Sequence, residues 1–315
     1  MAQYSQVPIK DAIEIAKRYG LKIDRVEPLS GGAANSSVII SGVDGDFTLT
    51  VLDNHDKETA EILGRIQSYP SENEIPVPRV CMTPSGSVVT YYNDTPIMIK
   101  EFVHGDVLRP FPSEHLFQVG AILGRLHKLP IPEYIPSGTR IMRTDWKEVL
   151  ADRDCPELYE MLQRANGSQD EWMGFESVLT HGDLFWDNTL IIEPNKVVIL
   201  DWELAGNDPA VLDLGMSFVG MCQTENQLDS HKVNELLRGY LSERSLSEAE
   251  LASLPVTTYY SAAVIALSRY VRMQITHVNP ERADWYKDMI EIGDSVLESQ
   301  TPFHDLPTPN TGPLL

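Results

Sequence analysis

The stretches THGDLFWDNTLII (residues 180–192) and VVILDWELAGNDPAVLDLG (residues 197–215) decide how this chain folds and what it can do. Both place acidic and amide side chains beside apolar runs that are typical of buried strands. Asp201 directly follows four apolar residues, and a carboxylate at the end of a buried strand is costly unless a positive group compensates its charge. Few basic residues lie nearby in sequence, so the expected partner is a metal ion.

The spacing of these polar residues predicts phosphoryl-transfer chemistry. Asp183 and Asn188 are separated by a turn, and Asp201 follows on the far side of a hairpin. The oxygens of Asn188 and Asp201 are hard ligands of the kind that Mg²⁺ prefers, and the hairpin lets them meet at one ion. Asp183 is then free to orient a substrate hydroxyl and to accept its proton.

These two segments resemble the catalytic and metal loops of the aminoglycoside phosphotransferase/choline kinase superfamily, a branch of the protein-kinase-like enzymes. Within that branch the chain is most similar to the phosphotransferase type of bacterial homoserine kinase. The resemblance covers roughly residues 20 to 220 and is thinner over 230–300. It rests on four segments in the same order: SSVIISGVDGDFTLTVLDN, NEIPVPRV, VGAILGRLHKL and HGDLFWDN.

The resemblance implies an α+β, two-lobed protein-kinase-like fold. Residues 1–102 would form a small antiparallel β-sheet lobe that covers the nucleotide, and residues 103–315 a larger, mostly helical lobe with the catalytic and metal loops at 181–213. The residue patterns agree with this division. They predict hairpins over 38–52 and 88–103, strands at 189–192 and 197–200, helices at 8–20, 57–67 and 113–128, mostly helical segments over 145–165 and 226–300, and an extended tail over 301–315.

The resemblance also implies a role for each matching residue of the catalytic segments. Asp183 would be the catalytic carboxylate, and Asn188 and Asp201 would bind Mg²⁺. His181 would brace the catalytic loop by hydrogen bonds, and Asp213 would hold the same loop through its backbone. The reaction would be direct, in-line transfer from ATP to a small-molecule hydroxyl.

The nucleotide would be held mainly by the smaller lobe. Most kinase-like enzymes have a lysine on the third strand, where this chain has Thr50, as the homoserine kinase type also tends to have. Lys57 and Lys100 are the candidate replacements. The phosphates would be covered by Ser30, Gly31, Gly32, Ala33, Ala34 and Asn35, and the adenine edge would meet the backbone of Glu101, Phe102 and Val103.

The acceptor stays open between homoserine or a related amino alcohol and an aminoglycoside, a choline-like amine or a sugar. An arginine near the acceptor would indicate a carboxylate, and the basic segment with Arg269, Arg272 and His277 is a candidate, although ordinary salt bridging explains it as well. A different class of function is a nucleotide-binding pseudokinase with a regulatory role, because the strand lysine is missing. The complete Asp183, Asn188 and Asp201 set argues against it.

Four more residues near these segments or on the predicted helices can be interpreted from their sequence context. Asp208 in the sequence Asn-Asp-Pro is typical of a turn and needs no function. His127 is interpreted as a buried brace, and Trp186 and Trp202 as hydrophobic support for the catalytic carboxylates.

The composition excludes some classes of partner. A net charge of −21 disfavours binding to nucleic acid or to anionic membranes, since both draw on lysine and arginine. Three widely spaced cysteines and no secretory signal pattern at the N-terminus predict reduced thiols and a cytoplasmic location. No apolar run approaches the length needed to cross a bilayer. The sequence leaves the oligomeric state open.

Overall fold

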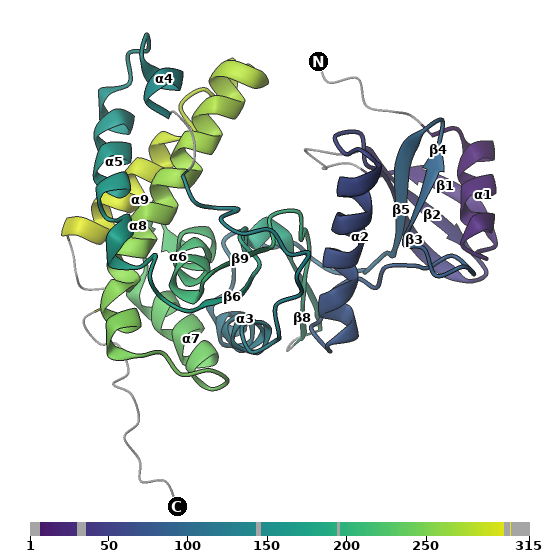
Figure 1. Ribbon diagram of the computed structural model, residues 1–315, viewed down its shortest axis with the longest axis horizontal. Helices are drawn as coiled ribbons and strands as arrows, with labels where there is room; N and C mark the ends of the chain where they lie inside the picture. Colours follow the sequence, from purple (N-terminus) through teal and green to yellow (C-terminus); the bar gives the residue numbers. More distant parts are fainter. Residues whose placement is uncertain (1–6, 30–35, 143–145, 194–195, 299–302, 304–315) are drawn as a thin grey trace, which may run out of the picture. The chain divides into compact units, whose positions relative to one another are not determined.

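The computed structural model of the protein describes residues 7–29, 36–142, 146–193, 196–298 and 303 (Figure 1). Contacts within the chain divide it into two compact units. Unit 1 comprises Met1–Asp106 together with the short segment Val198–Glu203, and unit 2 comprises Val107–Val197 and Leu204–Leu315. The short segment contains Asp201, so that residue belongs to the unit built mainly from the N-terminal part of the chain.

Unit 1 is built on a five-stranded antiparallel sheet in the order β1-β2-β3-β5-β4. Alternate residues of each strand point to opposite faces, and each face buries a different helix (Figure 1). Ile97 and Ile99 of β5 pack in the cluster that contains α1, whereas Met98 between them packs in the cluster that contains α2. The elements are α1 (Ile9–Arg18), β1 (Ile23–Pro28), β2 (Ser36–Gly42), β3 (Gly45–Val51), α2 (Lys57–Glu72), β4 (Val89–Tyr92) and β5 (Thr95–Glu101).

Unit 2 is mainly helical over its described residues, with short two-stranded sheets beside the helices. Helix α6 is buried along its whole length. The helices are α3 (Ser113–Leu126), α4 (Trp146–Leu150), α5 (Pro156–Gly167), α6 (Ala210–Met221), α7 (Ser230–Leu241), α8 (Glu248–Val271) and α9 (Lys287–Glu298). The strands are β6 (Ser177–Thr180), paired with β9 (Gly206–Pro209); β7 (Thr189–Glu193), paired with β8 (Lys196–Ile199); and β10 (Gln223–Thr224), paired with β11 (Gln227–Leu228).

Helices α3 and α7 cross closely because glycines line their contact. A Cβ atom at Gly120 would lie 1.9 Å from the carbonyl oxygen of Leu236, and one at Gly239 would lie 1.8 Å from that of Phe117. Neither position tolerates a side chain without a shift of the helix backbones. This close crossing brings the C-terminal end of α3, and with it His127, next to Tyr240 on α7.

The α+β fold class and both predicted hairpins of unit 1 are confirmed. The turn expected at Asp208 is wrong, because this residue lies in β9, paired with Val178 of β6. The short strands β1, β6 and β9 carry no alternation strong enough to predict them. The predicted helix 57–67 extends to Glu72, and of the predicted tail only Phe303 lies within the described residues.

One described helix, Glu248–Thr276, is long and apolar enough by length and composition to span a membrane. Of its most apolar window, 67% is buried against the rest of the protein, as in the core helix of a folded domain.

Candidate active site

The loop between β6 and η2 (Trp186–Asn188) presents the first candidate residues. Strand β6 ends at Thr180, and His181, Gly182 and Asp183 follow at once. Gly182 has a φ of +78°, and a Cβ atom there would lie 2.3 Å from the carbonyl oxygen of Leu204. Only glycine fits both the backbone conformation and the close approach, so this residue sets the turn that exposes Asp183.

Asp213 holds this loop from below through its backbone. Its Oδ2 accepts a hydrogen bond from the His181 N–H at 2.7 Å, and its Oδ1 accepts one from the Gly182 N–H at 2.8 Å. The carboxylate is 1% exposed, in the first turn of α6. Burial works to raise the pKa of Asp213, but the hydrogen bond from the His127 side chain, together with that from the His181 N–H, brings it below its ordinary value.

His127 continues a buried chain of hydrogen bonds behind Asp213. Its Nε2 lies 3.0 Å from Asp213 Oδ2, and its Nδ1 lies 2.9 Å from the Tyr240 hydroxyl. The carboxylate can only accept, so Nε2 carries the proton and Nδ1 accepts from Tyr240, whose oxygen accepts in turn from Arg244 Nη1. Burial lowers the pKa of His127, so it is neutral at pH 7. The expected brace therefore links α3, α6 and α7 to the catalytic loop.

Asp183 is held on both sides of its partly exposed carboxylate. Its Oδ1 forms an ion pair with Arg140 Nη2, and the Asn188 side-chain amide lies 3.4 Å from its Oδ2. Arg140 also donates from Nε to the Gly182 carbonyl at 2.5 Å, which fixes the guanidinium plane. The Asp183 side chain keeps 27% exposure, compared with 11% for Arg140. The carboxylate is thus oriented but still accessible to a small acceptor.

Arg140, which pairs with Asp183, was not predicted from the sequence. It lies 43 residues before its partner and follows a proline-rich loop, so no local pattern connects the two. Asp208 sets its position: Oδ1 accepts from the Gly138 N–H at 2.7 Å, and Oδ2 accepts from the Thr139 N–H at 3.2 Å. Asp208 is 3% exposed, and burial raises its pKa. Asp208 does not lie in a turn, and its hydrogen bonds to Gly138 and Thr139 hold the segment that carries Arg140.

Two further arginines lie in the surroundings of Asp183. The Arg109 guanidinium stacks 5.1 Å from the ring centroid of Trp186, in the catalytic loop, and that of Arg269 stacks 4.2 Å from the ring of Trp285. Burial lowers the pKa of Arg269 to about 10; Arg109 adds to this, whereas Asp288, Asp187 and Asp183 oppose it. Arg269 thus lies within electrostatic reach of the catalytic loop and stays charged at neutral pH.

Trp186 and Trp202 differ in their surroundings. Trp186 is partly exposed and its ring faces Arg109, so it does more than fill space. Trp202 is 2% exposed and belongs to unit 1. The interpretation as hydrophobic support therefore describes Trp202 better than Trp186.

The residues that would meet the adenine edge lie at the end of β5 in unit 1. The Glu101 N–H donates to the Arg79 carbonyl, and the Phe102 N–H donates to the Asp46 carbonyl, each at 2.9 Å. Both donors are thus used within unit 1. A purine edge that needs a backbone donor here would have to take it from Val103. The predicted phosphate-covering loop, Ser30 to Asn35, lies outside the described residues.

Thr50, which stands where most kinase-like enzymes have a lysine, is engaged by a residue of the neighbouring strand. The Thr50 hydroxyl lies 3.1 Å from that of Ser37 on the neighbouring strand, so the two share a hydrogen bond. Lys57 is exposed at the start of α2, with its ammonium 5.0 Å from the ring of Tyr91. Glu61 on the same helix accepts a hydrogen bond from the Tyr91 hydroxyl at 3.4 Å. This helix therefore directs its charges to Tyr91 instead of to a strand lysine.

Lys100 on β5 is the better placed of the two candidate lysines. It follows Met98 on the same face of the sheet, the face opposite α1. Burial lowers its pKa, while the nearby carboxylates of Asp201 and Glu203 oppose that shift. A cation within reach of Asp201 is what a phosphate site built without the usual lysine requires.

Two oxygen donors have the chemistry that Mg²⁺ needs. Asn188 Nδ2 donates to the Asp183 carbonyl at 2.8 Å; since a carbonyl only accepts, the amide nitrogen faces it and Oδ1 is left as a ligand atom. Asp201 lies two residues after the end of β8, with a φ of +55° and an exposed side chain. Among the described residues no group of three or more His, Cys, Asp or Glu could hold a metal. Two hard donors, completed by water and phosphate oxygens, fit this ion.

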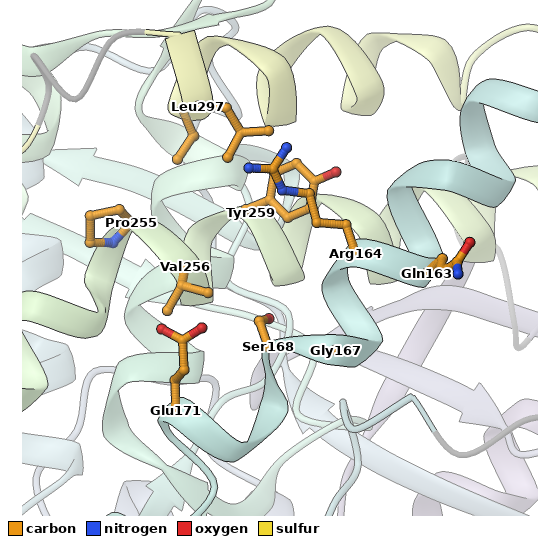
Figure 2. A pocket seen from close by; sticks show the side chains of 10 residues that line it. Gln163, Arg164, Gly167, Ser168, Glu171, Pro255, Val256, Tyr259 and Leu297 are labelled. Carbon is orange, nitrogen blue, oxygen red and sulfur yellow. The ribbon is translucent and has the colours of Figure 1, made fainter.

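A separate cavity lies between α5, α8 and α9 (Figure 2). It has a volume of about 510 Å³, and the Arg164 guanidinium packs 5.6 Å from the Tyr259 ring centroid at its wall. Leu297 of α9 also lines this cavity. The cavity shares no lining residue with the surroundings of Asp183 described above.

Known proteins resemble this chain in sequence and in fold. The family described as "Phosphotransferase enzyme family" matches residues 25–249. Homoserine kinase of Granulibacter bethesdensis is 26% identical over 262 residues, which cover 76% of this chain and 79% of that protein. A solved structure of spectinomycin phosphotransferase with ADP and spectinomycin covers 94% of this chain and 100% of its own (TM-score 0.71, 15% identity). The structure of a microcompartment-associated aminopropanol kinase covers 92% and 98% (TM-score 0.68, 17% identity).

Proposed function

Because this chain belongs to the phosphotransferase enzyme family, we propose that it transfers the γ-phosphate of ATP to a hydroxyl group of homoserine or a related amino alcohol. Its fold is the protein-kinase-like fold predicted from the sequence, and it is a small-molecule kinase that acts on a hydroxyl group. The likeness to homoserine kinases along most of both chains supports the proposed acceptor. The cytoplasmic location stays a prediction.

The observation that carries the proposed chemistry is the arrangement around Asp183. A carboxylate that is oriented by Arg140 and Asn188, and still 27% exposed, is suited to accept a proton from an acceptor hydroxyl. As that proton moves to Asp183, the acceptor oxygen forms a bond to the γ-phosphorus. The bond between the γ-phosphorus and its bridging oxygen breaks, and ADP leaves with that electron pair.

The proposed metal ligands are Asn188 and Asp201. When bound, Mg²⁺ neutralises charge on the transferred phosphate. Backbone N–H groups of residues 30–35 and the ammonium of Lys100 would add to phosphate binding, in place of a lysine at Thr50. In a chain with a net charge of −21, ATP binding is then expected to depend steeply on Mg²⁺.

The test is steady-state kinetics with ATP and an acceptor panel, for Asp183→Asn and for Asp170→Asn as a control. Asp170 is an exposed carboxylate on the short helix Gln169–Glu171. The Asp183 variant should lose about 10² to 10⁴ in kcat while ATP affinity persists, and the control should retain full activity. Unchanged turnover in the Asp183 variant would contradict the assignment. ATP binding that is equally tight with a chelator would contradict the metal-dependent phosphate site.

A further inference from the structure

Three arginines gather around the candidate catalytic carboxylate. Arg140 pairs with Asp183 directly, Arg109 stacks on Trp186 three residues further along the same loop, and Arg269 lies within electrostatic reach of Asp183. All of these residues belong to unit 2. In a chain with 25 basic and 46 acidic residues, such a concentration of guanidinium groups is not what a solvated acidic surface provides.

The local charge balance discriminates between classes of acceptor. Arg140 pairs with Asp183 and Arg269 lies beside Asp288, while Arg109, Asp187 and Asp183 act electrostatically on Arg269, so no excess of carboxylates surrounds these arginines. An acceptor that carries several ammonium groups would need an excess of carboxylates, because like charges in a partly buried site repel. An acceptor that carries a carboxylate instead brings the anion that the arginines can bind.

The three arginines differ in how far their N–H donors are already used by other residues. Arg140 is taken up by Asp183 and by the Gly182 carbonyl. Arg269 donates from Nη1 to the Trp285 carbonyl at 3.2 Å, while Asp288 lies 3.9 Å away, beyond hydrogen-bond distance. A guanidinium has five N–H donors, so Arg269 retains donors for an anion.

An aromatic ring packs against each of the two remaining arginines. Arg109 is exposed and lies against Trp186, whereas the Arg269 side chain is 15% exposed and lies against Trp285. A guanidinium packed against a ring has less side-chain freedom left to lose when it binds an anion, and its planar fork matches a carboxylate. Arg269 thus combines burial, an aromatic contact and unused donors.

We propose that Arg109 and Arg269 bind a carboxylate of the acceptor, while Arg140 positions Asp183 at the acceptor hydroxyl. The substrate class is then a hydroxy acid or amino acid whose hydroxyl lies a few bonds from its carboxylate. This proposal rests on the proposed kinase function and assigns the residues that determine its acceptor specificity.

The experiment compares two acceptors that differ only in the carboxylate. L-Homoserine and 3-aminopropan-1-ol share the hydroxyl, the carbon chain and the ammonium group, and the second lacks the carboxylate. The wild type should prefer homoserine in kcat/KM by about 10²-fold or more, because the analogue leaves the largely buried guanidinium of Arg269 without its anion. Arg269→Gln and Arg109→Gln should lower kcat/KM for homoserine at least about tenfold, mainly through KM, and far less for the analogue.

Two further variants control for loss of charge and loss of packing. Arg238→Gln removes an exposed arginine of α7 that stacks 6.0 Å from the ring of Phe117, away from the site, and should keep the wild-type preference. Arg269→Lys retains the charge without the planar fork and should restore only part of the preference. A preference for homoserine that persists in both glutamine variants would overturn the proposal, as would a wild type that prefers the analogue or an aminoglycoside.

Failure of the kinase function has a different signature. If the wild type phosphorylates no hydroxyl acceptor, the proposed function falls, and the carboxylate site is judged by calorimetric binding of homoserine alone. Binding by the wild type that is lost in Arg269→Gln would support the site. Equal binding by both proteins, or none by the wild type, would overturn it.

Discussion

Replacing Asp213 with Asn tests whether a buried charge holds the catalytic loop in place. Oδ2 of Asp213 accepts from the His181 N–H and from His127, whereas Oδ1 accepts from the Gly182 N–H alone. Asn can replace only one oxygen with an NH₂ group. The less costly orientation directs that group at the Gly182 N–H, so one hydrogen bond is lost and two donors then face each other.

The magnitude follows from the kind of bond that is lost. A hydrogen bond to a charged group contributes about 1.5–3 kcal/mol, so Asp213→Asn should lower the free energy of unfolding by about 2–3 kcal/mol. Displacement of the His181–Gly182 backbone by even a fraction of an ångström should also misplace Asp183, and kcat should fall by about 10-fold to 100-fold. The measurements are urea denaturation at pH 7 and steady-state kinetics on the same preparation.

Asp208→Asn is the matched comparison, because Asp208 is also a buried carboxylate that accepts several hydrogen bonds. Burial raises the pKa of Asp208, so at pH 7 its charge opposes folding, whereas the lowered pKa of Asp213 means that its charge favours the folded state. The loss of stability should therefore be smaller for Asp208→Asn. Equal losses in the two variants, or an Asp213 variant with unchanged stability and kcat, would refute this account of the loop.

Three further predictions concern the single residues His127, Gly182 and Lys100. Burial lowers the pKa of His127 below its value in the unfolded chain. As the pH falls, the unfolded state therefore binds a proton before the folded state does. The free energy of unfolding should decrease below about pH 6.5, by about 1.4 kcal/mol per pH unit, until the folded-state pKa is reached. Urea denaturation at pH 7.5 and 5.5 should show a weaker dependence in His127→Gln. Gly182→Ala should lose about 1–3 kcal/mol through its φ alone, and more through contact with the Leu204 carbonyl; a variant as stable and active as the wild type would exclude this constraint. Lys100→Met should raise KM for ATP at least about tenfold, with less change in KM for the acceptor. Lys57→Met should have the same KM values as the wild type. The reverse result would assign the phosphate contact to Lys57 on α2.

The sequence by itself was enough to predict the fold class and the candidate catalytic segment. The acidic and amide residues of HGDLFWDN follow one another closely, so their order alone indicates a loop with chemical function. The hairpins of unit 1 were also predictable, because alternation and turn residues are local signals. Asp183 could be proposed in this way because some of its neighbours in sequence, such as Asn188, are also its neighbours in space.

Only the tertiary structure decided how that carboxylate is held. Arg140, Asp208 and Arg269 come from segments far apart in sequence, and contacts over such separations leave no periodic trace in the chain. Asp208 shows the limit most clearly: the sequence Asn-Asp-Pro has the composition of a turn, yet strand pairing with β6 buries its carboxylate under the segment that carries Arg140. Local preference amounts to a few tenths of a kcal/mol per residue, which burial and pairing readily outweigh.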